Sequence, residues 1–402
     1  MHSPIRLQPI KVARGSVPTL AALCSALDIQ RAELDAALAL TAAERYQVRT
    51  VPKADGSERI VHNPHHLIRK IQRRLNRRFF ANPDVIKWPD HVFGSIPNDD
   101  LSTSPAADKD YVNCARQHCG AKSILSVDIK NFFDNIHRDK VRDVFTLFFK
   151  YPTDVAEALA DVCCKEDHVV QGALTSSYIA TLCLYDVEGL VVSKLRHKGL
   201  VYTRLVDDIT VSSRVTGYDF SYALRLIESM VDSAGLPLNT RKTRIQSVGM
   251  RPLLVHGLRV DFAEPRLPPE EPRKIRASVK QVELLAASPG YRASRAYRRD
   301  FNRCLGRVNK LARVKHTQHL PLLKRLQKIV PLPSHKDIER AEKQITRLER
   351  DSLKPGYKDT YWFYKRWHVA SERLTILKRS FPKTASDMRD RLRKLHPKKA
   401  YE

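Results

Sequence analysis

The cysteines of this 402-residue chain are few and irregularly placed. There are seven, an odd number, and none stands in the CxxC pairing of a structural zinc site. Scattered cysteines in a large chain favour reduced thiols in a cytosol over a disulfide framework. Two groups combine cysteine with histidine, one at residues 114–119 with His118 and one at residues 163–168 with His168. A metal site at either group is the less favoured alternative.

Long apolar runs are also missing. No stretch approaches the length of a membrane-spanning helix, and the N-terminus lacks the hydrophobic segment of a signal peptide. Internal repeats and low-complexity tracts are absent as well. The sequence therefore predicts a cytoplasmic protein that does not insert into a membrane.

Positive charge, by contrast, is abundant. Lys and Arg total 71 against 44 acidic residues, which gives a formal net charge of +27. A chain this basic repels itself unless it binds a polyanion, and nucleic acid is the usual one. A membrane-surface or ribosome-associated protein is the alternative. Since 42% of the residues are hydrophobic, the chain can bury a real core, and its length predicts two or three subdomains.

The N-terminal part of the chain shows two different patterns. Apolar residues at helical spacing in residues 17–41, with a break near Asp28, predict two short helices. In residues 47–62, valine and isoleucine alternate around an Asp-Gly pair that is favoured in tight turns. This predicts a β-hairpin with Lys53 and Arg59 on its arms.

The centre of the chain mixes strands and helices. A strand is predicted at Ser123–Ile129, one long helix at residues 174–197, and a strand, an acidic turn and a second strand at residues 200–213. The order β-α-α-β-β-α-β between residues 123 and 260 is that of an α+β layer with an antiparallel sheet. The other expected elements are helices at 65–80, 137–149, 219–234, 272–287, 291–313 and 318–329, strands at 244–248 and 253–260, a loop at 81–110, and a charged helical tail at 335–402.

Three aspartates lie where strands end. Asp128 follows apolar neighbours, and an unpaired carboxylate there would be costly to bury. Asp207 and Asp208 separate two hydrophobic strands, and adjacent carboxylates at a hairpin tip repel each other unless a cation lies between them. Such carboxylates suit two Mg²⁺ ions roughly 3.5–4 Å apart, an arrangement used in phosphoryl transfer. An ordinary acidic turn is the alternative for Asp207-Asp208 alone, but Asp128, the Gln171-Gly172 turn and the net charge favour the metal site.

Several segments occur in a fixed order along the chain: SVDIKNFFDNI, QGALTSSYIATL, YTRLVDDITVSS, GLPLNTRKTRI and VHGLRV. They resemble the palm motifs of bacterial reverse transcriptases of the retron type. Upstream, KADGSERIVHNPHHLIRKIQRRL is similar to the fingers of those enzymes, and downstream EPRKIRASV and CLGRVNKL are similar to their thumb. The resemblance covers about residues 17–330.

The resemblance implies an α+β right-hand polymerase fold, in which fingers, a palm with an antiparallel sheet and a helical thumb carry helical additions at both ends. The expected boundaries are 1–46 for an N-terminal helical region, 47–122 for the fingers, 123–262 for the palm with the catalytic site, 263–332 for the thumb and 333–402 for a basic helical C-terminal extension.

The same resemblance implies roles for individual residues. Asp128, Asp207 and Asp208 match the catalytic aspartates that bind two Mg²⁺ ions, with the Ile129 carbonyl as an additional metal ligand. Phe133 matches the aromatic residue that crowds the 2′-position and so favours deoxynucleotides. The expected nucleotide-binding residues are Lys53, Arg59, Phe133, Gln171, Gly172 and Lys242. Plainer alternatives are a core phenylalanine, solvated hairpin arms and a surface lysine.

Two elements resemble retron enzymes with departures. In DYVNCARQHCG, retron enzymes have an NAxxH element, but Cys114 occupies the place of the Asn. In Val255-His256-Gly257 they have a VTG triplet, linked to recognition of their own RNA, but His256 replaces the Thr. Leu205-Val206 also stands where an aromatic and a small residue are usual. With the basic fingers and thumb helices, the expected RNA-binding residues are Arg69, Arg73, Asn113, His118, Val255, His256, Gly257 and Arg307.

The tail segment YWFYKRWH mixes aromatic and basic residues, which suits stacking on unpaired RNA bases or, as readily, packing within the tail. The leading hypothesis is an RNA-directed DNA polymerase that copies a dedicated structured non-coding RNA into DNA from dNTPs, in a retron antiphage system with a possible effector protein. The alternatives are another reverse transcriptase lineage, of defence or intron-maturase type, and a non-catalytic RNA-binding protein on a polymerase body.

Overall fold

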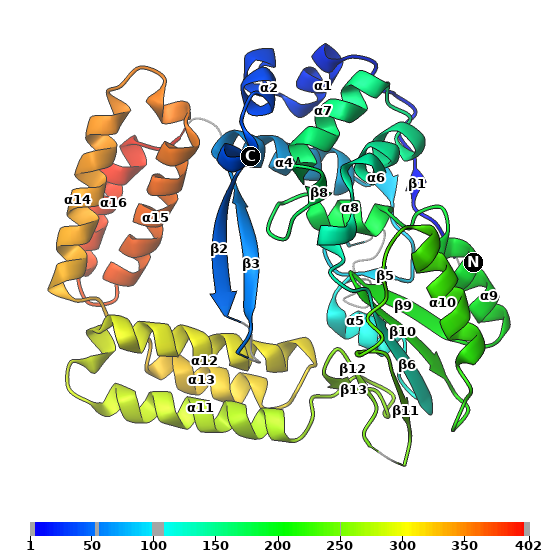
Figure 1. Cartoon of the computed structure of the whole chain (residues 1–402). Coiled ribbons are helices and arrows are strands. Elements are labelled where there is room, and N and C mark those ends of the chain that lie inside the picture. The colour runs from blue at the N-terminus through cyan, green and yellow to red at the C-terminus, as the bar shows by residue number, and fades with distance from the viewer. Residues whose placement is uncertain (1–4, 53–55, 99–107, 250, 398–402) are drawn as a thin grey trace. The chain divides into compact units, whose positions relative to one another are not determined.

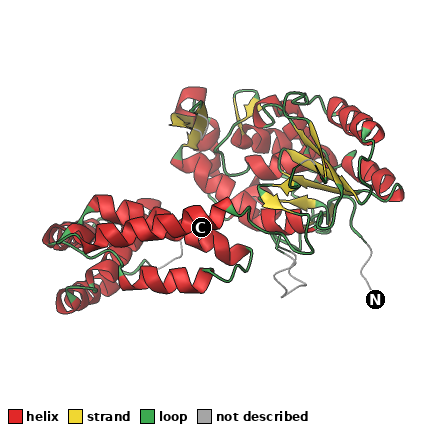
Figure 2. Ribbon diagram, turned by 90° about the horizontal axis from the view of Figure 1, so that it is seen from below, coloured by secondary structure: helices red, strands yellow, loops and turns green. Residues whose placement is uncertain are grey.

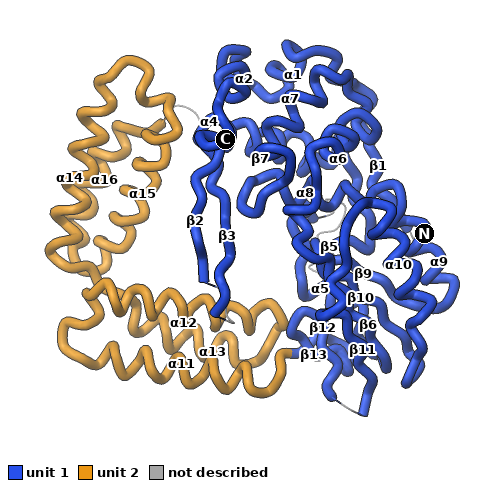
Figure 3. Tube along the Cα trace, in the orientation of Figure 1, with its two compact units in different colours: residues 1–266 blue, residues 267–402 orange. Residues whose placement is uncertain are grey.

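The computed structural model describes residues 5–52, 56–98, 108–249 and 251–397. The chain divides into two compact units, unit 1 at residues 1–266 and unit 2 at residues 267–402 (Figure 3). The strands belong to unit 1, whereas the described residues of unit 2 are helices and their connections (Figure 2). Among the described helices, none combines the length and the apolar character needed to cross a membrane.

A five-stranded sheet forms the centre of unit 1. Its strand order is β11-β6-β10-β9-β5, with antiparallel pairing except between β9 and β5. This confirms the predicted antiparallel sheet and adds a short parallel edge strand, β5, inside the segment that was expected to be loop. The strands are β5 (Val92–Phe93), β6 (Ser123–Asp128), β9 (Val201–Leu205), β10 (Asp208–Ser213) and β11 (Arg244–Ser247).

The sheet is buried because β6 and β10 carry side chains that are shielded on both faces. Helices α9 (Glu188–His197) and α10 (Ser221–Ser233) pack beside it (Figure 1). Leu195 of α9 and Ile227 of α10 belong to the same hydrophobic core as Leu125 and Val211 of the sheet. This core fixes the ends of β6 and β10, where the three aspartates lie.

An exposed two-stranded hairpin, β2 (Tyr46–Pro52) and β3 (Glu58–Pro64), forms a separate sheet in unit 1 (Figure 1). It confirms the predicted hairpin. Only Tyr46 and Pro64, which pair with each other at its base, are buried. Lys53, predicted to bind the nucleotide, lies outside the described residues.

The remaining small elements of unit 1 surround these two sheets. The two predicted N-terminal helices are confirmed, and Asp28 ends the first one in a left-handed conformation with φ 51°. The helices are α1 (Leu20–Leu27), α2 (Arg31–Leu38), α3 (Ala42–Arg45), α4 (His66–Leu75), α5 (Tyr111–Arg116), α6 (Arg138–Asp143), α7 (Thr153–Cys163) and α8 (Ser176–Leu182). Short strand pairs are β1 (Ile10–Lys11) with β4 (Ile86–Lys87), β7 (Cys164–Lys165) with β8 (His168–Val169), and β12 (Leu254–Val255) with β13 (Leu258–Arg259).

The prediction of one helix over residues 174–197 is wrong. The chain forms α8 and α9, separated by turns in which Tyr185 N–H donates to the Leu182 carbonyl at 3.0 Å and Val187 N–H to the Leu184 carbonyl at 3.3 Å. Such tight turns change the direction of the helix axis. The break allows Glu188, the first residue of α9, to pair with Arg204 of β9 in the core.

Unit 2 contains six α-helices in its described residues: α11 (Glu270–Ala287), α12 (Arg295–Arg313), α13 (His319–Lys328), α14 (His335–Ser352), α15 (Tyr361–Leu377) and α16 (Pro382–Lys394). Helices α14, α15 and α16 share a hydrophobic core of their own. In the aromatic tail segment, Phe363 is fully buried in that core and Trp367 Nε1 donates to the Leu392 carbonyl at 2.9 Å, while Trp362 is exposed. The packing alternative therefore holds for Phe363 and Trp367.

Candidate active site

The three aspartates lie at one end of the central sheet. Asp208 begins β10 and lies opposite Asp128, the last residue of β6, in the strand register. Asp207 stands in the two-residue turn between β9 and β10, and its carbonyl accepts a hydrogen bond from Ile129 N–H at 3.1 Å. The strand pairing, set by the apolar pattern of β6 and β10, thus brings together residues almost eighty positions apart in the sequence.

The turn that carries Asp207 has an unusual backbone. Val206 has φ 59°, a left-handed value that a β-branched residue rarely adopts. Its carbonyl accepts a hydrogen bond from Arg204 Nη1 at 3.1 Å. A turn with positive φ suits a two-residue hairpin, because its twist matches that of the strands. The structure therefore holds a strained turn in place with a buried guanidinium.

Arg204 itself is held by Glu188. Arg204 is fully buried, and its Nε and Nη2 each contact one carboxylate oxygen of Glu188 at 2.6 Å, a bidentate pair. Tyr202 donates its hydroxyl to the same carboxylate at 2.8 Å. Burial by itself would raise the pKa of Glu188, but the adjacent guanidinium outweighs burial and holds this pKa well below its usual range.

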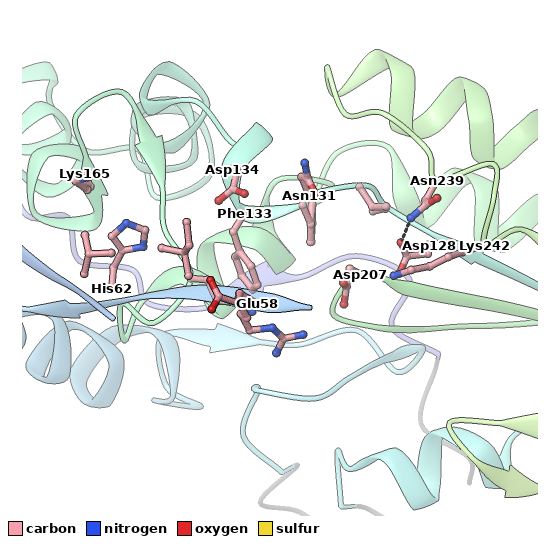
Figure 4. A pocket seen from close by; sticks show the side chains of 16 residues that line it. Glu58, His62, Asp128, Asn131, Phe133, Asp134, Lys165, Asp207, Asn239 and Lys242 are labelled. Carbon is pink, nitrogen blue, oxygen red and sulfur yellow. Dashed lines mark hydrogen bonds and ion pairs between the residues drawn. The ribbon is translucent and has the colours of Figure 1, made fainter. Parts of the chain in front are cut away.

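Asp128 is buried and already bonded. Its carboxylate accepts from Asn239 Nδ2 at 3.0 Å and from Lys242 Nζ at 2.9 Å (Figure 4). Asn239 N–H also donates to the Asp128 carbonyl at 2.8 Å, so the loop after α10 is tied to the end of β6. The hydrogen bond to Asp128 raises the pKa of Lys242, which keeps the ammonium group charged.

The other two carboxylates lie in a less favourable environment. Burial raises the pKa of Asp207, and the nearby Asp128 carboxylate adds to this effect. For Asp208, burial and then the charges of Asp207 and Asp128 raise the pKa to about 6. Yet the Asp208 side chain is 55% exposed, so it remains open to a ligand from solvent. Clustered carboxylates with raised pKa values indicate a site that is stabilised by an added positive charge.

Hard cations fit this set of oxygen donors. Among the described residues, no three His, Cys, Asp or Glu side chains converge on one point. At Asp128, the ammonium group of Lys242 supplies the positive charge instead. Because Asp208 is exposed and Lys242 is a flexible, 64% exposed side chain, both can rearrange around a cation without disturbing the core.

A cavity of about 570 Å³ opens in front of Asp128 and Asp207, whereas Asp208 is not among the residues that line it (Figure 4). It is bounded by the end of β6, the β2–β3 hairpin and the loop before α8. Arg59, Phe133, Gln171 and Lys242, all predicted to bind the nucleotide, line it together with Asp128, Ile129 and Asp207. Its volume lies within the range of about 300–1,000 Å³ that is usual for small-molecule sites.

Gly172, the remaining predicted nucleotide-binding residue that the structure describes, has a structural role. Its φ of 108° suits glycine, and a Cβ built on it would lie 2.5 Å from the carbonyl oxygen of His62. Next to it, His62 N–H donates to the Gln171 carbonyl at 2.8 Å. The loop is therefore pressed against β3, and only glycine allows this approach. The contact fixes Gln171 beside the base of the hairpin.

The comparisons with known proteins agree with this geometry. The family described as reverse transcriptase (RNA-dependent DNA polymerase) matches residues 51–285, more than half of the chain. The retron Ec48 reverse transcriptase of Escherichia coli is 45% identical over 98% of this chain and 96% of that protein. The chain belongs to the bacterial retron reverse transcriptases. The retron Se72 reverse transcriptase of Salmonella heidelberg is 28% identical over 79% of this chain and 80% of that protein.

This reverse transcriptase is accordingly an RNA-directed DNA polymerase of a retron system, with a right-hand polymerase fold. Its family generally uses divalent metal ions. Of the hypotheses drawn from the sequence, neither an intron-maturase lineage nor a non-catalytic RNA-binding protein is supported. The assignment of roles to single residues and the domain boundaries stay predictions.

The residues predicted to bind RNA fall into two groups in this reverse transcriptase. Asn113, His118 and Val255 are buried, so their side chains are not exposed to RNA in this structure. The side chain of His256 is 9% exposed and faces Asp208, while Gly257 is exposed in the turn after β12. Two of them contact the β9–β10 hairpin: His118 reaches Thr203 and Ser212, and His256 faces Asp208.

The basic residues predicted to bind RNA differ from them. Arg307 of α12 is exposed, with one guanidinium nitrogen 3.3 Å from Ser278 Oγ. Arg69 and Arg73 of α4 are half-buried, and Arg69 donates to Asn63 Oδ1 at 2.7 Å. All three can reach solvent, so direct contact with a phosphate backbone stays a prediction for them.

Sequence reasoning missed the Glu188–Arg204 pair. The available signal was an arginine in the middle of an otherwise apolar strand, because a charge buried there needs a carboxylate partner. The sequence does not say which carboxylate. Asn239 was placed in its motif but not among the site residues, and its two hydrogen bonds to Asp128 now put it there.

Proposed function

We propose that this retron reverse transcriptase copies a dedicated structured RNA into DNA at Asp128, Asp207 and Asp208. The observation that carries the proposal is the register of β6 and β10, which opposes Asp128 and Asp208 beside a turn that presents Asp207. Two Mg²⁺ ions would be held by these carboxylates, with the Ile129 carbonyl as a further oxygen ligand. When bound, such ions lower the pKa of a primer 3′-hydroxyl and neutralise the triphosphate and the leaving pyrophosphate.

The chain's own residues bind and orient the incoming nucleotide. Arg59 of β3 offers a guanidinium to the triphosphate, and Gln171 borders the nucleotide from the loop anchored on β3. Lys242 reaches the aspartates from the other side and remains charged because its pKa is raised. A charged ammonium there can donate a proton to pyrophosphate as it leaves.

Phe133 supports the choice of deoxynucleotides. It is half-buried, its neighbour Phe132 is buried, and both border the cavity. Phe133 is the more accessible of the two, and it is the one that the motif predicts. Replacement Phe133→Ala should relax selection against ribonucleotides by about 10- to 100-fold in kcat/KM, as expected for one lost steric contact. If selection against ribonucleotides did not change, Phe133 would have a role in core packing only.

Primer extension on an RNA template with Mg²⁺ and dNTPs tests the proposed chemistry. Asp207→Asn combined with Asp208→Asn should lower kcat at least about 1,000-fold, because the oxygen ligands lose their charge. Thermal unfolding of the same variant should show an unchanged or higher Tm, since the substitutions remove mutual repulsion. Full activity of this double variant would refute the mechanism.

The RNA partner and the biological role need separate tests. Nucleic acid purified with the protein should contain a short DNA joined to one structured RNA, and heterogeneous RNA without DNA would contradict a dedicated template. A role in antiphage defence, with an effector protein, is supported by family resemblance alone. Cells carrying the retron locus with the intact chain should resist phage better than cells with the double aspartate variant.

A further inference from the structure

A chain of buried polar side chains lies behind Asp208. His118 Nδ1 contacts Ser212 Oγ at 2.7 Å, and His118 Nε2 contacts Thr203 Oγ1 at 2.7 Å. Cys114 Sγ lies 3.2 Å from Thr203 Oγ1 and 3.2 Å from His256 Nε2. His256 Nδ1 then faces Asp208 Oδ2 at 3.9 Å. The chain joins α5, β9, β10 and the β12–β13 hairpin, all of them in unit 1.

The members of this chain are shielded from water. Cys114, His118, Thr203 and Ser212 are each at most 3% exposed, and the His256 side chain is 9% exposed. A buried polar group without a partner is costly, so such networks define the orientation of each member. Asp208 lies at the end of this network, and its side chain is 55% exposed to solvent.

The contacts of His256 determine which of its ring nitrogens carries a proton. A neutral imidazole carries one N–H and one acceptor nitrogen, and its partners select which nitrogen is protonated. If Nδ1 of His256 were the acceptor, its lone pair would face the Asp208 carboxylate. The favourable arrangement has the Nδ1–H pointing to Asp208 and Nε2 as an acceptor beside Cys114, whose single S–H lies within reach of both Nε2 and Thr203 Oγ1.

The backbone fixes the ring of His256 from the other side. Val255 pairs with Leu258, so His256 and Gly257 form a two-residue turn, and both have positive φ, 48° and 76°. Such a turn accepts few residue types at its first position. The segment after this hairpin is tied to the turn that follows α5, because Gly120 N–H donates to the Val260 carbonyl at 2.8 Å. The β12–β13 hairpin, which carries His256, is therefore held in place by its own turn and by this hydrogen bond.

We propose that His256, oriented by Cys114, is a positioning residue that holds the Asp208 carboxylate ready for metal binding. The separation of 3.9 Å exceeds a hydrogen bond. It closes through a bridging water or through rotation of Asp208, whose side chain is 55% exposed. Hydrogen bonds from outer groups to metal-binding carboxylates are known to tune metal affinity. The inference rests on the proposed role of Asp208 as a metal ligand.

The network also connects the two departures from the retron pattern. Cys114 stands in place of an Asn and His256 in place of a Thr, and these two side chains touch each other at 3.2 Å. Residues in contact are energetically coupled, so replacing one changes what the other needs. The pair is therefore one unit, in which the thiol sets the orientation of the imidazole.

The test is the Mg²⁺ dependence of primer extension by the full chain, for wild type and His256→Ala, His256→Asn and His256→Gln. Asn places an N–H donor near the position of Nδ1 and tolerates the left-handed backbone, whereas Gln places its donor near Nε2. His256→Ala and His256→Gln should raise the Mg²⁺ concentration for half-maximal rate about tenfold. His256→Asn should stay within about threefold of wild type, and the exposed His197→Ala serves as a matched control.

The Cys114 variants provide a second reading that does not depend on the turn. Cys114→Ala should shift the Mg²⁺ requirement in the same direction, and Cys114→Ser, which retains a donor, should not. Cys114→Asn with His256→Thr should be closer to wild type than either single substitution. RNA affinity without Mg²⁺ should stay unchanged in all of them, and thermal unfolding reports whether each variant is folded.

Three results would overturn the inference. One is a folded His256→Ala enzyme whose Mg²⁺ requirement equals that of wild type. Another is a loss of RNA affinity without a change in Mg²⁺ requirement, which would make His256 an RNA contact. The third is equal behaviour of Asn and Gln at this position. Activity that survives Asp208→Asn would instead refute the proposed function, so the two failures are distinguishable.

Discussion

The two hairpins that border the cavity are built in opposite ways. In the β9–β10 hairpin nearly every side chain is buried, and the turn is held from within by Arg204 and Glu188. In the β2–β3 hairpin most side chains are exposed, and those near its base are half-buried or buried, where His62 N–H bonds to the loop at Gln171. The backbone that carries the groups proposed for metal binding is thus fixed by the core, whereas Arg59, proposed to meet the triphosphate, stands on an exposed strand.

Glu188→Gln should be the most damaging change to the hairpin held from within. Gln keeps the volume but leaves the fully buried Arg204 without a counter-charge. Breaking one side of a buried pair costs about 3–5 kcal/mol of the free energy of unfolding, which urea denaturation measures. Glu228→Gln on the exposed face of α10 is the matched control, with an expected change within about 0.5 kcal/mol. Equal effects of the two variants would show that the pair does not hold the hairpin.

The same pair predicts a pH dependence. The pKa of Glu188 is lower in the folded chain than in the unfolded chain, so its stabilising effect is present above the unfolded value near 4.5. It is lost as the pH falls from 4.5 toward the lower folded value. Wild type should therefore lose stability more steeply than Glu188→Gln on acidification below pH 4.5. Parallel curves for the two proteins would contradict this assignment.

Arg59→Ala tests the exposed hairpin. Arg59 lines the cavity from β3 and is exposed, so its loss should leave the free energy of unfolding within about 0.5 kcal/mol of wild type. One lost charge-assisted contact to a triphosphate should raise KM for dNTP about tenfold at unchanged Mg²⁺ requirement. Arg49→Ala on β2 is the control, because Arg49 is exposed and is not among the residues that line the cavity. If both variants raised KM equally, Arg59 would act only through its positive charge and not through a specific contact with the triphosphate.

Local patterns allowed the exposed hairpin and the acidic hairpin to be predicted from the sequence. Alternation around an Asp-Gly pair and two apolar strands around Asp207-Asp208 are signals that a few neighbouring residues carry. The opposition of Asp128 and Asp208 followed from the ordered motifs, and the strand register confirms that they lie together. Sequence reasoning therefore found the features that neighbouring residues or the order of motifs indicate.

Long-range partners could not be predicted. Glu188 reaches Arg204 only because the expected long helix breaks into α8 and α9, and nothing in its apolar spacing marks the break. His118 and His256 were predicted to bind RNA. In the structure they are linked by contacts that run from His118 to Thr203, then to Cys114 and then to His256. Motif resemblance tells which residues matter but not which way their side chains face.

The smallest expected effect is a difference in stability between Gly and Ala variants, and its sign should be opposite in the two hairpins. Val206 has a left-handed backbone, which costs an L-residue about 1–2 kcal/mol, whereas Val51 of β2 is in an extended strand. Ala and Gly remove almost the same packing at either position. At residue 206, Val206→Gly should therefore be more stable than Val206→Ala by about 1 kcal/mol, since Gly relieves the backbone strain. At residue 51, Val51→Gly should be less stable than Val51→Ala by about 0.5–1 kcal/mol, because Gly gains only entropy in the unfolded chain. The free energies of unfolding of the four variants, measured by urea denaturation, give both differences. The same sign at both positions would mean that the Val206–Asp207 turn stores no strain, and that Arg204 contacts a relaxed backbone.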